Sequence, residues 1–270
     1  MNAPQRHVGE HIRDWRTRRR MSQMDLALEA EISTRHLSFL ETGRAQPSRE
    51  MVLLLSDQLE IPLRERNVIL VAAGYAPVFP ERNLDAPELA SARRAVDLIL
   101  KAHEPYPALV VDLRWNLVAA NAAALPLLDG VAPELLTPPL NVIRASLHPR
   151  GLAPRIANLG EWHSHILERL RRQADLTADP GLLSLVDEIK TYPKPPAPDR
   201  RPEDLGNVAI PFQLMMGDTL LSMIGTTTVF GTPVDITLSE LTLETFFPAD
   251  TQTADILRAA HEARQAAAAA

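Results

Sequence analysis

The stretch from residue 22 to residue 43 reads SQMDLALEAEISTRHLSFLETG and decides the fold of the first part of the chain. Ser22 is a good N-cap for one short helix, and Ser33 is a good N-cap for a second. Gly43 is suited to end the second helix, because glycine tolerates the left-handed backbone of a helix C-terminus. The stretch therefore predicts two helices joined by a turn.

Apolar residues extend this helical pattern on both sides of the stretch. From residue 8 to residue 73 they recur at helical spacing, and proline is nearly absent. The pattern predicts five short helices, and so an all-α domain over residues 1–76. Gly74, Pro77, Pro80 and Pro87 then break the pattern, and a helix resumes near residue 88. We therefore expect a linker and connecting helix over residues 77–104.

The second part of the chain mixes helices with short β-prone runs. Gly217 and Asp218 suit a tight hairpin turn, and residues 193–202 hold five prolines, which predicts a loop. We expect an α+β domain with an antiparallel sheet over residues 105–258 and an alanine-rich tail over 259–270. The predicted strands are residues 108–113, 116–120, 207–216, 219–230, 234–238 and 241–247, and the predicted helices are 122–128, 159–173 and a last one that Asp250 caps.

Length and composition exclude several classes of protein. The chain has 270 residues, which suggests two domains, and it holds 46% hydrophobic and 23% charged residues, near the average for globular proteins. No apolar run approaches the roughly 18 residues that a membrane span needs, and the first residues do not resemble a secretory signal. We therefore expect a cytoplasmic protein with no membrane partner. The absence of cysteine excludes disulfides, thiolate zinc sites and cysteine nucleophiles.

Charge is distributed unevenly along the chain. Residues 1–50 hold nine arginines against seven acids, whereas residues 81–270 hold 17 basic against 24 acidic residues, within a net charge of −6. A protein that binds duplex DNA needs positive groups on one face of one module, and here they lie early in the chain. The basic cluster at Arg16, Arg18, Arg19 and Arg20 is suggestive only, since such a run is more often a solvated helix end.

The stretch 22–43, with its flanks over roughly residues 8–73, resembles the XRE-type, or phage-repressor-like, helix-turn-helix domains. The shared pattern is a polar-Gln start, Leu-Ala in the first helix, an apolar turn residue and a second helix ending in Leu-Glu-x-Gly. The resemblance implies that the second helix enters the major groove of DNA, where it would read bases through Thr34, Arg35 and Phe39. The family usually has a polar residue at the position of Phe39.

The resemblance also implies a double-stranded DNA operator as partner. We expect a homodimer, because one small helix-turn-helix module makes a short interface, whereas two modules about 34 Å apart can read a palindrome. By the same resemblance, Gln23 would brace a backbone phosphate at a helix N-terminus. The alternative is a five-helix bundle that serves protein contacts. The candidate DNA-binding residues are Gln23, Thr34, Arg35, His36, Ser38, Phe39, Arg44, Gln46 and Ser48.

Several segments of the second part resemble, in order, the ligand-binding domain of MmyB-like transcriptional regulators, a PAS-like sensor. They include residues 115–121, 147–152, 230–233 and 246–250. The resemblance implies a small lipophilic effector, with a fatty acid as the best candidate. Each candidate side chain also suits an ordinary core or surface position. The candidate ligand-binding residues are Trp115, Arg144, His148, Phe212, Met215, Met223 and Phe230.

An enzymatic function has little support in the sequence. His148, Glu161, His163 and His165 form the one cluster with metal-ligand character, but His163 and His165 point to different faces of a predicted helix. No phosphate-binding glycine loop or nucleophile elbow is present. We therefore expect no catalytic residue, no metal and no cofactor beyond the effector. A regulator or adaptor whose second domain only dimerises or binds a protein partner stays as the alternative.

Overall fold

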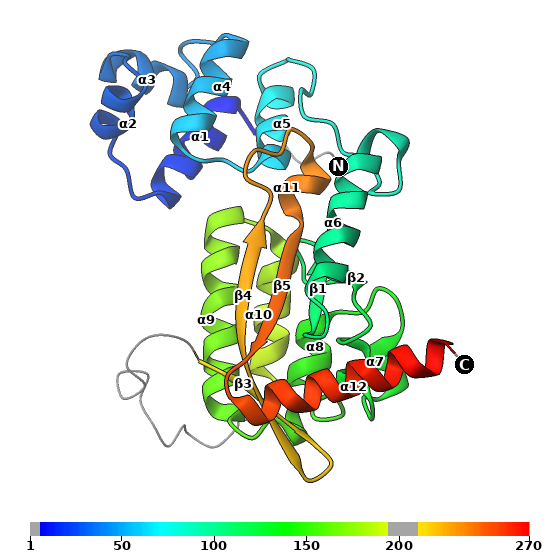
Figure 1. Ribbon diagram of the computed structural model, residues 1–270. Coiled ribbons are helices and arrows are strands. Elements are labelled where there is room, and N and C mark those ends of the chain that lie inside the picture. The colour runs from blue at the N-terminus through cyan, green and yellow to red at the C-terminus, as the bar shows by residue number, and fades with distance from the viewer. Residues whose placement is uncertain (1–5, 194–209, 270) are drawn as a thin grey trace. The chain divides into compact units, whose positions relative to one another are not determined.

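A computed structural model describes residues 6–193 and 210–269 (Figure 1). It divides into two compact units. The first comprises Met1–Arg82 with Pro233–Ser239, and the second comprises Asn83–Thr232 with Glu240–Ala270. The segment Pro233–Ser239 thus interrupts the second unit in the sequence but belongs to the first unit. The predicted proline-rich loop, apart from Pro193, and the predicted strand residues 207–209 lie outside the described residues.

The first unit contains the five predicted helices. Ser22 and Asp25 form a capping box, in which each side chain accepts a hydrogen bond from the other residue's backbone N–H. Ser33 and Ser48 cap the next two helices through their hydroxyls. Gly43 has φ +73°, so the second residue after α3 needs glycine's conformational freedom. The helices are α1 (Val8–Arg18), α2 (Gln23–Glu29), α3 (Thr34–Glu41), α4 (Arg49–Gln58) and α5 (Leu63–Ala72).

Close packing of α1 against α3 holds the helix-turn-helix together. Leu26, Leu37 and Leu40 are fully buried, so both motif helices turn apolar residues inward. Gly9 of α1 faces the C-terminal end of α3, where an added Cβ would lie 2.1 Å from the carbonyl oxygen of Leu40. The side chain is absent here because the two backbones approach each other too closely for one.

The second unit contains one antiparallel sheet of five strands in the order β2-β1-β5-β4-β3. The predicted hairpin at Gly217 and Asp218 joins β3 to β4, and Gly217 has φ +59°. Strand β5 lies in the middle, paired with β1 through Leu243 and with β4 through Phe246. The strands are β1 (Ala108–Val111), β2 (Leu117–Ala120), β3 (Phe212–Met216), β4 (Thr219–Val229) and β5 (Thr242–Pro248).

Helices α9 and α10 lie side by side next to the sheet (Figure 1). Their buried leucines and isoleucines form one core with Val111 and Trp115. A second core joins β3 and β4 to Leu257 of α12. The helical elements of this unit are η1 (Pro87–Leu89), α6 (Ala90–Ala102), η2 (Leu125–Leu128), α7 (Pro133–Leu136), α8 (Val142–Leu147), η3 (Ala153–Arg155), α9 (Leu159–Thr177), α10 (Pro180–Lys190) and α12 (Thr251–Ala269).

Two predicted elements differ from the structure. The sequence predicts a strand over residues 234–238, but α11 (Ile236–Glu240) is a helix, and its residues up to Ser239 belong to the first unit. The Asp235 carboxylate accepts from the Thr237 backbone N–H at 2.9 Å, which favours a helical turn over an extended chain. The predicted helix 122–128 is reduced to the 3-10 turn η2. Asp250 does cap the last helix, through the N–H of Thr253.

Candidate functional site

Two arginines, one on α3 and one in the loop after it, lie against an aromatic ring of α3. Thr34 and Arg35 are exposed, whereas Leu37 and Leu40 beneath them are buried. The guanidinium carbons of Arg35 and Arg44 lie 5.3 and 5.9 Å from the centroid of the Phe39 ring. Cation–π attraction of this kind is worth about 0.5–1 kcal/mol at exposed sites. The ring therefore orders one cation on the helix that the sequence predicts to enter the groove and a second cation in the loop that follows it.

A buried carboxylate at the end of α3 positions this helix. Glu41 is 5% exposed and accepts from Arg16 of α1 at 2.6 and 2.9 Å and from the Gln23 amide at 2.7 Å. The hydrogen bonds with Glu41 raise the pKa of Arg16, so the guanidinium stays charged. Arg16 also donates to the carbonyl of Met21. One ionic cluster thus ties α1, the α1–α2 turn, α2 and α3 together.

The other predicted DNA-binding residues occupy different positions. Gln23 is half-buried at the start of α2, and its side-chain amide nitrogen donates a hydrogen bond to Glu41. A phosphate at this helix start would therefore have to bind the second amide hydrogen of Gln23 or the backbone N–H groups. Gln46 donates to the carbonyl of Ala73, and the Ser48 hydroxyl caps α4. His36 and Ser38 are half-buried on α3. Thr34, Arg35 and Arg44, by contrast, are exposed.

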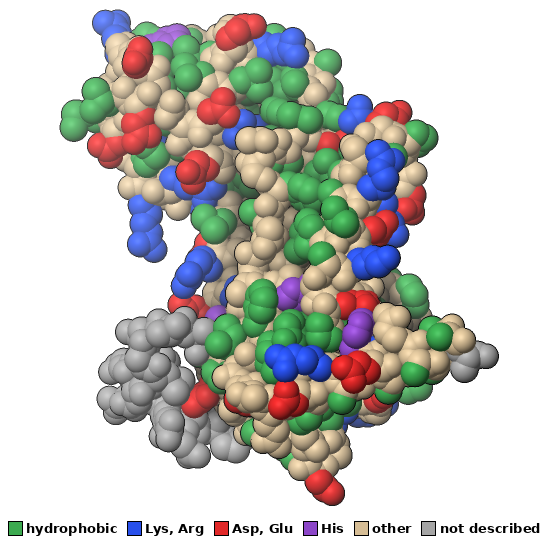
Figure 2. Space-filling model, viewed as in Figure 1, with side chains coloured by type: hydrophobic (Ala, Val, Ile, Leu, Met, Phe, Trp, Pro, Cys, Tyr) green, Lys and Arg blue, Asp and Glu red, His purple; other side chains and the backbone are tan. Residues whose placement is uncertain are grey.

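The basic cluster after residue 15 is partly structural. Arg19 donates to the carbonyls of Leu59 and Glu60 and lies 5.2 Å from the Trp15 ring, and Arg16 holds Glu41. The cluster is thus not simply a solvated helix end. On the face of the first unit seen in Figure 2, basic, acidic and hydrophobic side chains are interspersed.

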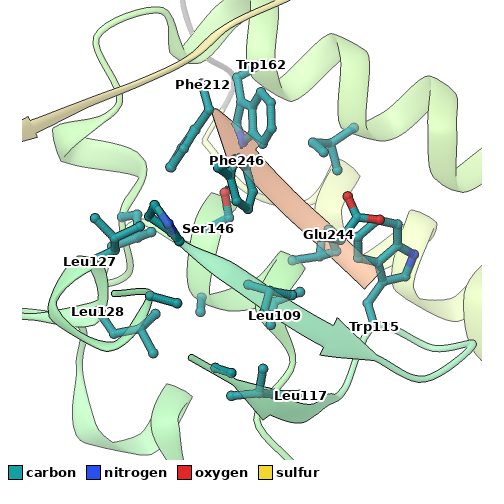
Figure 3. A pocket seen from close by; sticks show the side chains of 18 of the residues that line it. Leu109, Trp115, Leu117, Leu127, Leu128, Ser146, Trp162, Phe212, Glu244 and Phe246 are labelled. Atoms are coloured by element: carbon teal, nitrogen blue, oxygen red, sulfur yellow. Dashed lines mark hydrogen bonds between the residues drawn. The ribbon is translucent and has the colours of Figure 1, made fainter. Parts of the chain in front are cut away.

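A cavity of about 110 Å³ lies in the second unit (Figure 3). Its walls come from β1, β2, β5, the chain around η2, α8 and α9. The lining is almost entirely apolar, which suits a hydrocarbon ligand because such a surface offers few hydrogen bonds to water. The apolar lining residues are Pro107, Leu109, Trp115, Leu117, Ala120, Ala124, Leu125, Leu127, Leu128, Val142, Ile143, Ala145, Leu152, Trp162, Ile166, Phe212 and Phe246.

One ion pair marks the polar end of the cavity. Of the described lining residues, Arg169 and Glu244 carry charge. Arg169 of α9 donates to both carboxylate oxygens of Glu244, at 2.9 and 2.5 Å, and its guanidinium carbon lies 4.5 Å from the centroid of a ring of Trp115. Glu244 and Trp115 are neighbours at one end of the view in Figure 3. A polar head group entering the cavity would meet this pair.

A second polar group lies on α8. The Ser146 hydroxyl accepts a hydrogen bond from the Trp162 indole N–H at 3.0 Å, and both residues line the cavity. Because a hydroxyl can donate as well as accept, Ser146 can still donate a hydrogen bond to a ligand oxygen. The cavity thus offers one neutral and one ionic group among apolar walls.

The predicted ligand-binding residues divide into two groups. Trp115 and Phe212 line the cavity, whereas the other five residues do not. Strand alternation explains Met215, which follows the inward-facing Leu214 on β3 and is half-buried. Met223 is fully buried in the core beside the cavity, and Phe230 follows the end of β4.

Arg144 and His148 are engaged elsewhere. Arg144 donates to both oxygens of Glu188 at 2.7 to 3.0 Å, and this lowers the pKa of that carboxyl. The His148 ring packs edge-on against Tyr192, with centroids 5.0 Å apart. The cation that the cavity does contain, Arg169, was not predicted. Its position three residues after the inward-facing Ile166 on α9 is the signal that would have found it.

Among the described residues, no group of three or more His, Cys, Asp or Glu side chains is arranged to hold a metal ion. His163 and His165 have pKa values lowered by burial. In the same part of the chain, no helix has the length and apolar character that crossing a membrane requires.

Comparison with known families assigns each part of the chain to a family model. A model of the MmyB-like transcription regulator ligand binding domain matches residues 92–260, and a helix-turn-helix model matches residues 12–66. The chain therefore belongs to the MmyB-like transcription regulators, DNA-binding proteins with a ligand-binding domain.

No curated protein matches the chain. One solved structure with some similarity is described as an RNA-binding Light-Oxygen-Voltage receptor, at 13% identity and a TM-score of 0.26. That alignment covers 96% of this chain and 64% of the receptor chain, so this chain corresponds to under two thirds of it.

Proposed function

We propose that the protein is a homodimeric regulator that binds one operator sequence through α3 and changes its affinity for that operator when a lipophilic effector enters the cavity. The exposed cations Arg35 and Arg44, held against the half-buried ring of Phe39, support the DNA-binding half of the proposal. Arg35 reads guanine through two hydrogen bonds, while Thr34 and Phe39 contact thymine methyls. Two copies would place their recognition helices about 34 Å apart, one turn of DNA.

Selection of duplexes from a random library by the full-length protein tests the DNA-binding half. Arg35→Ala should weaken binding to the selected sequence by about 1–3 kcal/mol, roughly 5- to 150-fold, with much less effect on random duplex. Arg13→Ala, another exposed arginine of the first unit, serves as the control. An equal loss on both duplexes would reassign Arg35 to phosphate contact, and the absence of any selected sequence would refute operator recognition.

The effector is proposed to be a fatty acid whose chain packs against the apolar walls of the cavity and whose carboxylate binds Arg169. Family membership supports a small ligand, and the lining supports a hydrocarbon. Burial contributes about 0.8 kcal/mol per methylene, so affinity should increase with chain length until the cavity is full.

Calorimetric titration with octanoate, decanoate and dodecanoate measures this trend. Ser146→Trp would fill part of the cavity, while Ser184→Trp on the exposed side of α10 is the matched control. We expect the first variant alone to lose binding. If neither the acids nor the corresponding alcohols bind the wild-type protein, a second domain that binds a protein partner or only dimerises becomes the better proposal.

A further inference from the structure

The segment between β4 and β5 is held in the first unit by polar contacts. The Asp235 carboxylate is 1% exposed and accepts from Arg82 at 3.0 Å. The backbone N–H of Ile236 donates to the carbonyl of Pro80 at 2.9 Å, and the Thr237 hydroxyl donates to the carbonyl of Arg82 at 2.5 Å. Together these contacts attach α11 to residues 80–82.

The chain just before residues 80–82 is hydrogen-bonded to α5 of the helix-turn-helix domain. Asn67 of α5 accepts from the backbone N–H groups of Val78 and Phe79 at 2.9 and 3.1 Å, and it donates to the carbonyl of Phe79 at 2.7 Å. Because α5 packs on α1 and α4, a displacement of α11 would be passed to the helices that hold α3.

The other end of α11 leads directly into the cavity wall. Helix α11 ends at Glu240, and β5 begins at Thr242. Glu244 and Phe246 of β5 both line the cavity, and Glu244 holds Arg169. Glu244 lies four positions after Glu240, a span of at most about 13 Å at roughly 3.3 Å per residue. Strand β5 thus belongs to the cavity and continues into the attached segment.

The small size of the cavity makes movement of β5 the expected response to a ligand. A single water needs about 10–15 Å³ by the same measure of volume, so about 110 Å³ holds only a group of several atoms. A longer chain must displace the walls, and a carboxylate that binds Arg169 must displace Glu244.

We propose that β5 and α11 transmit effector binding from the cavity to the DNA-binding unit, with the Arg82–Asp235 attachment as the essential link. This inference rests on the proposed function and specifies its regulation. It requires a coupling free energy, which is reciprocal: the effector changes operator affinity by the same factor as the operator changes effector affinity. Typical factors are about 5- to 150-fold.

Arg82→Ala in the full-length protein tests the link, with dodecanoate as the probe and the selected operator as DNA. We expect the two separate dissociation constants to stay within about twofold of wild type, while the coupling factor falls from at least about fivefold to below twofold. Arg93→Ala is the matched control, because Arg93 has the same 38% side-chain exposure and pairs with the exposed Asp85 at 2.8 Å. It should keep the wild-type coupling factor.

Thr237→Val removes a neutral hydrogen bond of the attachment and leaves no buried charge unpaired, so it serves if Arg82→Ala does not fold. Hydrogen exchange of the Ile236 amide gives a second readout, since this N–H is bonded to Pro80. Dodecanoate should change its exchange rate in the wild-type protein.

The inference would be overturned if the coupling factor were unchanged in both variants. It would also be overturned if the wild-type protein bound both ligands with a coupling factor of one. In either case the proposed binding of DNA and effector would stand. Failure of the wild-type protein to bind dodecanoate or any operator would instead refute the proposed function, and the inference with it.

Discussion

Glu41 and Glu244 are both buried carboxylates that an arginine from another element binds through two hydrogen bonds. The side chain of Glu41 is 1% exposed, and it positions α3. Glu244, at 7%, stands in the wall of the cavity, where a ligand can compete for its arginine. Removing one partner of such a pair leaves a buried charge unpaired, which is strongly destabilising. Conservative amide substitutions are therefore the informative ones at both positions.

Glu244→Gln should increase affinity for dodecanoate relative to dodecanol. A fatty acid carboxylate must compete with Glu244 for Arg169, and the amide both competes less and removes a repelling charge. We expect the ratio of the two dissociation constants to shift by about fivefold or more, measured by calorimetry above pH 6. Glu168→Gln, on the exposed side of α9, should leave the ratio unchanged. An unchanged ratio in Glu244→Gln would place the head group elsewhere.

The Arg144–Glu188 pair should make stability depend on pH in the acid range. Hydrogen bonds from Arg144, and from Tyr192, lower the pKa of Glu188 below its usual 4.5. The unfolded chain therefore binds the proton more readily, so the pair's contribution is complete above about pH 4.5 and disappears as pH falls through the lowered pKa. Because both side chains are over a third exposed, the contribution should be about 1 kcal/mol or less.

Urea unfolding from pH 3 to pH 7 measures that contribution as the difference between wild type and Glu188→Gln. The difference should be largest near neutral pH and should shrink toward pH 3. Asp187→Asn, at the neighbouring exposed position, is the control and should show a smaller pH dependence. A Glu188→Gln difference that is constant over this range would mean that the ion pair does not contribute.

The sequence predicts an element where the residues that determine it lie close together in the chain, and fails where they lie far apart. Helix α3 was predicted because Ser33, the spacing of Leu37 and Leu40, and Gly43 all lie within one short segment. The segment at Asp235 was misassigned because Val234, Ile236 and Leu238 alternate as in a strand, whereas its partner Arg82 is 153 residues away. Contacts across such a separation leave no periodic signal.

The same distinction applies to the cavity. Trp115 and Phe212 were predicted as lining residues, and both line it. Met215 and Met223 were predicted to bind the ligand as well, but the sheet register turns Met215 away and buries Met223 in the core. Chemical type predicts which residues are apolar, while strand register and helix rotation decide which of them face one cavity. The lining role of Phe246 depends on that register.

Gly9→Ala tests the packing of α1 on α3. Alanine favours a helix over glycine by about 1 kcal/mol, yet its Cβ would lie 2.1 Å from a backbone oxygen of α3. The clash should prevail, with a net loss of about 1–3 kcal/mol in unfolding free energy and weaker operator binding. Gly231→Ala, where an added Cβ meets no atom within 4 Å, is the control and should be nearly neutral. An equally stable Gly9→Ala protein would contradict the close approach.

The three tryptophans report on different parts of the protein. Trp15 is buried in the first unit, 4% exposed, whereas Trp115 and Trp162 line the cavity of the second. An effector in the cavity should therefore alter the intrinsic fluorescence through Trp115 and Trp162. At 100 times its dissociation constant the effector should also stabilise the folded protein by about 2.7 kcal/mol.

Titration of Trp15→Phe with dodecanoate should retain the fluorescence change, and Trp162→Phe should lose a large part of it. Tryptophan-to-phenylalanine changes preserve an aromatic ring, so both variants should fold, although Trp162→Phe gives up the hydrogen bond to Ser146. The midpoint of the fluorescence change must agree with the dissociation constant from calorimetry, because both follow one binding event. A fluorescence change that is undiminished in Trp162→Phe would contradict the cavity assignment.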